Sequence, residues 1–345
     1  MNYILLILCF LISTSCQSLS LKPNSPTRYV VQKGDTLWTI ANRYLEKPWE
    51  WKQLWRANPK INNPNRLYAG DILFLVNDSD TPYIRVKPNG TIKLSPTPRA
   101  SALESPVPTI PLSIIQPWLN ESLVLDEDVL SSAPYIVAFM GEHMMGGQGN
   151  EVYVKGLHPS PIIPTEGAIN YSIFRQGTNY VNPITGNFLG YKATLVGYGE
   201  LKAGGEPATV LITDIIEGVR KLDRVLINNS PELNLYFEPQ APAFTFTGFI
   251  IDMPGGIPSG NSQEAVGQVI VISLGAENGF KPGDVIGLFN KPRIVKDPKN
   301  LLVPIHLPPE RLGEAMIFRT FTKTSFALIV RSIRPIYYLD RVANP

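Results

Sequence analysis

The stretch Tyr29–Val76 constrains the fold of this chain more than any other part. It contains three segments, YVVQKGDTLWTIANRY, WEWKQLWRANPKINNP and RLYAGDILFLV. The first begins as a β-rich run, and apolar residues then recur twice at helical spacing. The second helical pattern ends before Pro59, because a residue preceding proline avoids the helical region. Ile72 to Val76 is typical of a returning strand, so the pattern predicts a strand–helix–helix–strand unit.

These segments resemble the LysM domain, a small βααβ module that binds polymers containing N-acetylglucosamine, chiefly bacterial peptidoglycan. The resemblance rests on YVVQKGDTLWTIA, RANPKI and LYAGDILFL, and it covers residues 28–76. Because three motifs occur in the family's order and spacing, the signal is stronger than any one motif alone. The resemblance implies an α+β unit that binds glycan.

In LysM domains the sugar lies between the loop after the first strand and the loop after the second helix. Backbone groups of the first loop would hydrogen-bond an N-acetyl amide, and apolar side chains would cover its methyl. A purely structural role, in the turn and the helix cap, is an equal alternative for Gly34 and Asp35. The implied ligand-binding positions are Gly34, Asp35, Thr36 and Leu37 in the first loop, and Asn58, Pro59 and Ile61 in the second.

Three tryptophans in this stretch have two alternative roles. Trp38, Trp51 and Trp55 are candidates for flat platforms that stack on sugar rings. Their helical spacing favours the alternative, in which they form part of the core.

The chain begins with a pattern typical of an export signal. Residues 1–15 contain the apolar run Ile4–Ile12, which is too short to span a bilayer, followed by small residues and Cys16. This resembles a bacterial lipoprotein signal, with Cys16 as the lipidated residue. Two departures, the lack of Lys or Arg before the run and Ser13 in place of a large aliphatic residue, leave ordinary cleavage as the alternative. With no aspartate after Cys16, the resemblance implies sorting to the outer membrane of a Gram-negative bacterium.

Cysteine usage and charge limit the functions open to the exported chain. Its two cysteines are Cys9 and Cys16, so no thiol beyond Cys16 remains for a disulfide, a nucleophile or a metal. The net charge of +2 gives no electrostatic case for nucleic acid. We expect no cofactor and no metal.

A proline-rich segment follows, at residues 77–130. Its eight prolines disfavour helix interiors and central strands. The dipeptide Asn89-Gly90 predicts one hairpin, between 84–88 and 91–94. Between Pro111 and Pro117, the spacing of apolar residues predicts a short helix over 113–119 that Pro117 limits. The remainder of the segment is expected to be an extended linker.

The C-terminal part has the composition of β structure and contains an internal repeat. LITDIIEGVRKLDRV, from Leu211, and LIVRSIRPIYYLDRV, from Leu328, align without a gap. Upstream, LGYKATLV parallels LGEAMIF, and the expected front halves are APYIVAF…VYVKGL and GQVIVIS…VIGLFN. Chance similarity between short strands is the alternative. We expect two related β-barrel-like modules, at 131–230 and 243–345.

The chain shows no recognisable catalytic constellation. Cysteine peptidases and transpeptidases need a thiolate, and zinc amidases need several histidines with carboxylates. The three histidines, His143, His158 and His306, have no metal-ligand spacing. Glu142-His143 is the one carboxylate–histidine neighbour, and a loop pair is its more ordinary interpretation.

The sequence therefore favours a non-enzymatic envelope protein that is exported and periplasmic. It would bind peptidoglycan, reach the outer membrane through a lipid on Cys16, and offer its β modules to an envelope protein partner. The looser resemblance outside residues 28–76, to exported proteobacterial LysM proteins, implies no defined activity. One alternative is a cell-wall hydrolase with an unrecognised C-terminal site. Another is a secreted, host-facing binder of chitin or peptidoglycan.

Overall fold

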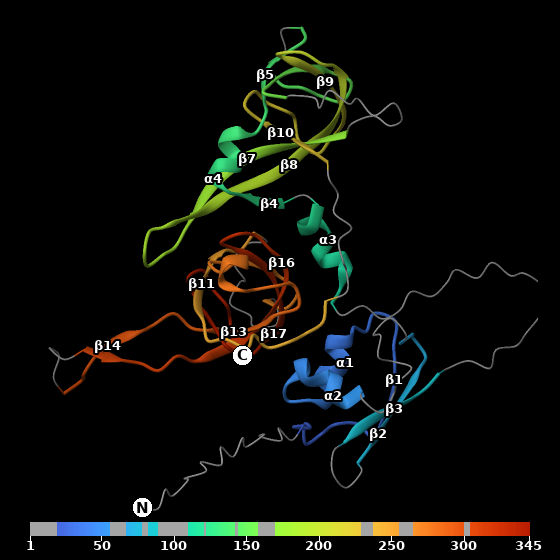
Figure 1. Ribbon diagram of the computed structural model, residues 1–345. Helices are drawn as coiled ribbons and strands as arrows, with labels where there is room; N and C mark the ends of the chain where they lie inside the picture. The colour runs from blue at the N-terminus through green and yellow to red at the C-terminus, as the bar shows by residue number, and fades with distance from the viewer. Residues whose placement is uncertain are drawn as a thin grey trace, which may run out of the picture. The chain divides into compact units, whose positions relative to one another are not determined.

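The chain forms two compact units, Met1–Val107 and Pro108–Pro345. The computed structural model describes residues 19–55, 67–77, 82–88, 110–120, 122–141, 144–157, 170–228, 237–254, 265–299 and 304–345. The signal segment 1–15 and Cys16 lie outside these residues. Strands predominate, with a small α+β unit near the N-terminus and a closed six-stranded barrel near the C-terminus (Figure 1). The predicted fold class is confirmed.

The first unit packs two helices on one face of an antiparallel sheet. Strands β1 and β2 pair with Tyr29 opposite Leu73. The core is formed by apolar residues of both helices together with Leu73, which has no exposed surface. The elements are β1 (Arg28–Val30), α1 (Leu37–Tyr44), a 3-10 turn (Pro48–Glu50), α2 (Trp51–Trp55) and β2 (Ile72–Val76).

A third strand extends this sheet in a way that the sequence did not predict. Strand β3 (Tyr83–Lys87) pairs antiparallel with all five residues of β2. The sequence places these residues in the linker, as one arm of a hairpin whose turn and return strand lie outside the described residues. The physical reason for the difference is burial, because Ile84 of β3 has no exposed surface and belongs to the same core as Leu73.

Further elements occupy the end of the predicted linker. Helix α3 (Leu112–Asn120) continues through Pro117 instead of ending there. Strand β4 (Ser122–Leu125) pairs with β8, and α4 (Glu127–Ser132) follows it. These residues therefore belong structurally to the second unit.

The second unit contains two rings of strands, and the first ring has six antiparallel strands in the order β5-β6-β9-β8-β7-β10. Strand β10 returns to β5 through Arg224 opposite Tyr135, and β4 pairs only with β8, outside the ring. A cluster of buried apolar residues fills the inside. The strands are β5 (Tyr135–Phe139), β6 (Glu151–Lys155), β7 (Asn170–Val181), β8 (Phe188–Ala203), β9 (Ala208–Ile215) and β10 (Arg224–Ile227).

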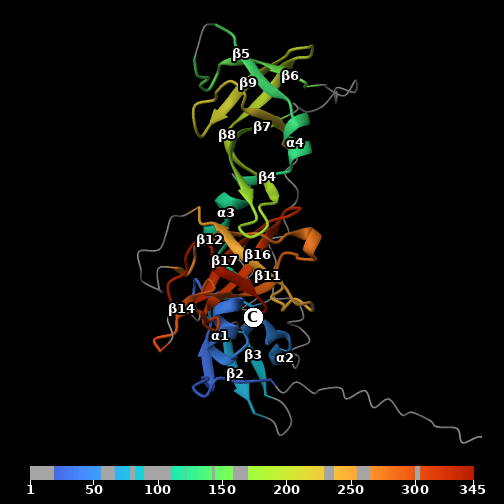
Figure 2. The ribbon, with the colours of Figure 1, turned by 90° about the vertical axis from the view of Figure 1, so that its left-hand side faces the viewer.

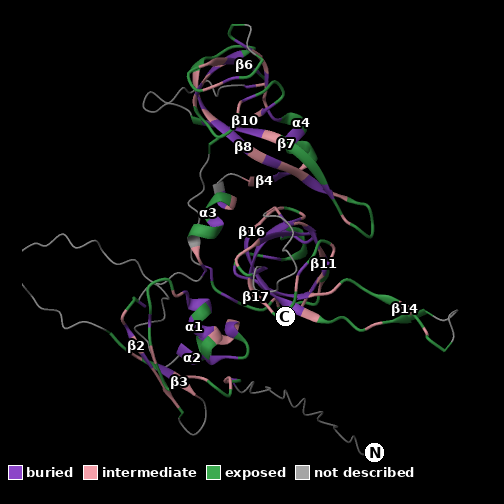
Figure 3. Ribbon diagram, turned by 180° about the vertical axis from the view of Figure 1, so that it is seen from behind, coloured by how far each residue is buried: buried purple, intermediate pink, exposed green. Residues whose placement is uncertain are grey.

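The remaining strands form a closed barrel with its own buried core, in the order β11-β12-β17-β16-β13-β18. Its buried strands and an exposed ribbon, β14–β15, are distinguished by colour in Figure 3. The strands are β11 (Thr247–Asp252), β12 (Val269–Ile272), β13 (Val285–Phe289), β14 (Ile294–Lys296), β15 (Pro304–His306), β16 (Arg311–Thr320), β17 (Ser325–Ser332) and β18 (Arg341–Ala343).

The two rings have the same connectivity. If the ribbon is set aside and each ring's strands are numbered along the chain, both have the order 1-2-5-4-3-6. The repeated fifteen-residue segments supply strands five and six of each ring, β9–β10 and β17–β18. Short apolar strands that were alike by chance would have no reason to occupy equivalent positions in two rings of identical order.

The structure corrects the alignment upstream of these segments. Gly197 pairs with Ile215 and Gly313 with Ser332, which are equivalent positions of the repeat. The segment equivalent to LGEAMIF therefore begins at Val196, seven residues after the predicted Leu189. The predicted correspondence of the front halves is also wrong by one strand. The prediction aligns β5 with β12, whereas in the structure β5 is equivalent to β11 and β6 to β12. The predicted match followed a shared Leu-Gly dipeptide, whereas register depends on cross-strand pairing.

Candidate functional site

The loop between β1 and α1 is held by a tight turn at Gly34-Asp35. The carboxylate of Asp35 accepts the backbone N–H of Gln32 at 2.8 Å, and Gly34 has a φ of 94°. Glycine adopts this left-handed conformation without steric cost. A side chain added at Gly34 would meet no atom within 4 Å, so the backbone of this turn is open to an approaching ligand.

Tyr29, on strand β1, stabilises the turn through a hydrogen bond. Its hydroxyl donates to the Asp35 carboxylate at 2.7 Å, and the Arg43 guanidinium lies 4.7 Å from the centre of its ring. Partial burial, followed by the hydrogen bond to Asp35, raises the pKa of Tyr29. The phenol is therefore a neutral donor, and Oδ2 of Asp35 accepts hydrogen bonds from both Tyr29 and Gln32.

The next two residues are inside the unit. Thr36 is the N-cap of α1, where its side chain accepts the Thr39 N–H at 3.1 Å. Thr36 is 2% exposed and Leu37 is 3% exposed. The Leu37 side chain thus belongs to the core, which differs from the expectation that it could cover an N-acetyl methyl. The surface that this loop can offer to a sugar is the backbone around Gly34.

The predicted residues Asn58, Pro59 and Ile61 lie outside the described residues. The structure therefore brings together the four positions of the first loop and describes one wall of the groove that the resemblance implies.

A second glycine–aspartate turn lies beside the first, and the sequence analysis did not single it out. The Asp71 carboxylate accepts the Tyr68 N–H at 2.9 Å, and Gly70 has a φ of 95°. Val31 accepts the Gly70 N–H at 2.7 Å and donates to the Asp71 carbonyl at 2.9 Å. The first and last motifs of the stretch are thus hydrogen-bonded to each other. The signal that could have found this is the dipeptide Gly-Asp, which occurs in both motifs.

The three tryptophans of this stretch are core residues, as their helical spacing predicted. Trp38, Trp51 and Trp55 are each 5% exposed or less, and the rings of Trp51 and Trp55 meet edge to face. They are not available as sugar platforms in this arrangement.

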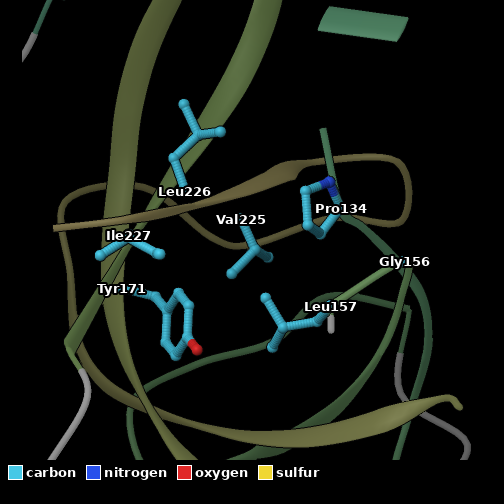
Figure 4. A pocket seen from close by; sticks show the side chains of 7 residues that line it. All are labelled: Pro134, Gly156, Leu157, Tyr171, Val225, Leu226 and Ile227. Atoms are coloured by element: carbon cyan, nitrogen blue, oxygen red, sulfur yellow. The ribbon is translucent and has the colours of Figure 1, made fainter. Parts of the chain in front are cut away.

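The first ring contains a pocket of about 400 Å³ at one end. Figure 4 shows Leu157, Tyr171 and Val225 facing the same space, whereas Leu226 points away from it. Burial raises the pKa of Tyr171, so its hydroxyl stays protonated. Among the described residues, the lining offers apolar contact and one phenol, without a carboxylate or a histidine to move a proton. The other lining residues are Pro134, Gly156 and Ile227.

The buried aspartates of the second unit serve turns. Asp223, Asp284 and Asp340 each accept the backbone N–H of the residue three positions earlier. Within the described ranges, no three His, Cys, Asp or Glu side chains gather as a metal ion would need. His306 is exposed on β15, whereas Glu142, His143 and His158 lie outside those ranges.

The chain contains a LysM domain, since residues 29–75 match the model of that family. LysM domains bind glycans that contain N-acetylglucosamine, so this part of the chain is a carbohydrate-binding module. A comparison with curated proteins finds no match. Among the helices in the described part of the chain, none combines the length and the apolar character needed to cross a membrane.

Proposed function

We propose that the protein is a non-enzymatic, periplasmic component of a Gram-negative cell envelope. It holds peptidoglycan through its LysM domain and is tethered to the outer membrane by a lipid on Cys16. The observation that carries the proposal is the LysM domain itself, with the open backbone turn at Gly34 beside the second turn at Gly70. The lipid and the glycan site would link two layers of the envelope.

The two barrels are proposed to meet an envelope protein. Ile216 and Ile333 are equivalent residues of the repeat, and each is 50% exposed. Apolar residues close to them in the sequence are also exposed in both rings. Exposed apolar side chains that gather on one surface favour a protein contact. These neighbours include Ile215 and Leu222 in the first ring, and Tyr337 and Tyr338 in the second.

Co-sedimentation of the chain from Gln17 onward with insoluble peptidoglycan tests the glycan site. Gly34→Val should abolish binding, because a β-branched residue is strained at a φ of 94° and its side chain would block the turn. Gly149→Val is the matched control, since Gly149 has a φ of 84° and equally open surroundings in the first ring. If the two variants bind equally well, the proposed site is wrong.

The same tubes test the absence of enzyme activity. We expect no soluble muropeptides to appear during the incubation. Their release by the wild-type chain would instead support a hydrolase with a C-terminal site. Incorporation of labelled palmitate by the full chain, lost in Cys16→Ala, tests the tether, and no labelling would favour a secreted binder.

A further inference from the structure

The third strand gives the LysM sheet a surface that the family match does not include. The match ends at residue 75, whereas β3 begins at Tyr83 and pairs with β2 over five residues. In Figure 2 the strands of this sheet lie below its helices. Because side chains alternate along a strand, the sheet has an inner face toward the helices and an outer face away from them.

The outer face is largely apolar. Leu73 and Ile84 define the inner face, since both are completely buried, so their neighbours along the strands point outward. Cross-strand partners share a face, which places residues of all three strands together. The apolar members of this outer face are Val30, Ile72, Phe74, Val76 and Tyr83.

Three cations are interleaved with these side chains. Phe74 of β2 lies between its cross-strand partners Arg28 of β1 and Arg85 of β3. Ile72, two residues earlier in β2, lies in the same way between Val30 and Lys87. Neighbouring strands lie about 4.8 Å apart, so the backbones carrying the two arginines are about 10 Å apart with the Phe74 ring between them. All three cations are exposed.

No carboxylate neutralises these cations within the described residues. None of the three takes part in an ion pair there. The nearby Asp35 and Asp71 are held in their turns. A groove of about 670 Å³ along β2 and β3 is lined by Phe74, Val76, Arg85 and Lys87, with Leu75, Val86 and Pro88. The face therefore favours an anionic ligand that also has apolar groups.

We propose that this outer face is a second binding surface for the wall polymer and takes its carboxylate-bearing peptide stems. The inference rests on the proposed function and deepens it. Guanidinium groups bind carboxylates through paired hydrogen bonds, which suits separate acidic groups spaced along a peptide. Phe74 and its aliphatic neighbours would cover the methyl groups of the stem. The turn at Gly34 would bind the glycan strand, and the outer face of the sheet would bind the peptide stems attached to that strand.

The test compares three solid probes with the chain from Gln17 onward at low salt. They are intact peptidoglycan, peptidoglycan stripped of its peptides by an amidase, and chitin. The double variant Arg28→Gln, Arg85→Gln should bind intact peptidoglycan about tenfold more weakly, because two charge-assisted contacts are lost. It should bind stripped peptidoglycan and chitin as the wild type does. The matched control combines Lys296→Gln on the exposed β14 strand with Arg293→Gln just before it. It makes the same change in net charge and should have no effect.

The outcomes separate the inference from the proposed function. If the wild type binds none of the probes, the glycan site fails. If the wild type binds and the double variant matches it on intact peptidoglycan, the glycan site stands and the second surface is refuted. Vesicles of phosphatidylglycerol and phosphatidylcholine provide the last arm. A loss of vesicle binding in the double variant, with wall binding intact, would assign the face to a membrane and overturn the proposal. The melting temperatures of the variants confirm that each one is folded.

Discussion

Asp223 and Asp340 occupy the same place in the two rings. Each accepts a backbone N–H three residues earlier at 2.7 Å, from Arg220 and Tyr337 respectively. Their carbonyls accept the N–H groups of equivalent residues, Ile136 at 3.0 Å in β5 and Ile250 at 2.9 Å in β11. Each aspartate thus closes a turn and joins the last strand of its ring to the first. This explains why the aspartate of Leu-Asp-Arg-Val is shared by both copies.

The residue before each aspartate has an unfavourable backbone conformation. Leu222 and Leu339 have φ values of 72° and 69°. Three other turns of this form, each ending in aspartate, have glycine at that position: Gly34, Gly70 and Gly283. A leucine in the left-handed region costs about 1–3 kcal/mol, whereas glycine pays only its extra backbone entropy, about 0.5–1 kcal/mol.

We therefore expect Leu222→Gly to stabilise the protein by about 1 kcal/mol, from these two opposing costs. Leu222 is 67% exposed, so little apolar burial is lost. Leu222→Ala is the control, because it removes the same side chain and keeps the strain. Chemical denaturation would measure both, and an alanine variant more stable than the glycine variant would contradict the argument.

A second prediction concerns Gly197 of β8 and Gly313 of β16, which occupy equivalent positions in the two rings. A side chain at Gly197 would lie 2.6 Å from the Asp214 carbonyl oxygen, and one at Gly313 would meet the equivalent carbonyl of Arg331. We expect Gly197→Ala and Gly313→Ala each to destabilise the protein by about 1–3 kcal/mol through overpacking.

Gly147→Ala provides the comparison, because its nearest contact would be an ordinary 3.7 Å. It should change the free energy of unfolding by less than about 0.5 kcal/mol. Thermal unfolding of the three variants distinguishes the cases. A neutral Gly313→Ala would show that the two registers are not equivalent.

The sequence predicted what depends on local pattern. Helix α1 follows from Gly34, the Thr36 cap and the apolar spacing after it, and the repeat follows from an ungapped run of letters. The placement of β3 could not be predicted in this way. Asn89-Gly90 is a strong local hairpin signal, and the pairing of Tyr83–Lys87 with β2 depends on burying Ile84 against the helices. The predicted alignment upstream of the repeat failed for a similar reason, because register is set by pairing with distant strands.

The same distinction, between local pattern and distant pairing, applies to the candidate site. The turn at Gly34-Asp35 could be predicted, since its residues dictate its conformation. The helical spacing of Leu37 also indicates its burial, whereas its position in the family implies contact with the ligand. The outer face of the sheet was not predicted, because Arg28, Phe74 and Arg85 become neighbours only through strand pairing.

A third prediction concerns Arg319, which holds the end of α3. Its guanidinium donates to the backbone carbonyls of Trp118, Leu119 and Ser122 at 3.1, 2.6 and 3.0 Å. Burial lowers its pKa to about 10, which still leaves it charged at neutral pH. A cation at a helix C-terminus also interacts favourably with the helix dipole. These contacts satisfy backbone carbonyls at the end of the helix, after Pro117.

Arg319→Met should destabilise the protein by about 2 kcal/mol, since hydrogen bonds to a charged group are lost while its desolvation cost is recovered. Amide exchange in α3 should become faster. Thr322→Val is the comparison, because the exposed hydroxyl of Thr322 donates to Asp126 at 2.6 Å and should contribute less than about 1 kcal/mol. If amide exchange in α3 is unchanged in Arg319→Met, the role assigned to Arg319 is wrong.

The fourth prediction is a pH dependence at Asp284. Burial raises the pKa of its carboxyl, against the opposing effects of the Lys281 N–H, the Gln240 amide and the Lys281 charge. Because the folded protein then holds this proton more tightly than the unfolded chain, the contribution of Asp284 to stability is greatest at low pH. That contribution is lost as the pH rises through the folded pKa. The charged carboxylate is therefore a cost at neutral pH.

Asp284→Asn should consequently gain stability relative to the wild type as the pH rises from about 4 to 7, because it has no charge to bury. The side-chain carbonyl of the asparagine can still accept the hydrogen bond from the Lys281 N–H. The Gln240 side chain can rotate so that its carbonyl accepts a hydrogen bond from the new amide group. Denaturation of both proteins across this range measures the difference. A gap that narrows with rising pH would contradict the assignment.

Asp340→Asn should behave differently, although burial also raises the pKa of Asp340. Its two oxygens accept the backbone N–H groups of Lys291 and Tyr337, at 3.0 and 2.7 Å, and neither donor can be reversed. An asparagine would leave one of them facing an N–H₂ group, which costs about 1–3 kcal/mol. We therefore expect the variant to be less stable than the wild type at about pH 3, below the ordinary pKa of an aspartate, where a carboxyl whose pKa is raised is protonated and both side chains are neutral. Equal stability of the two proteins at that pH would show that one of these hydrogen bonds is dispensable.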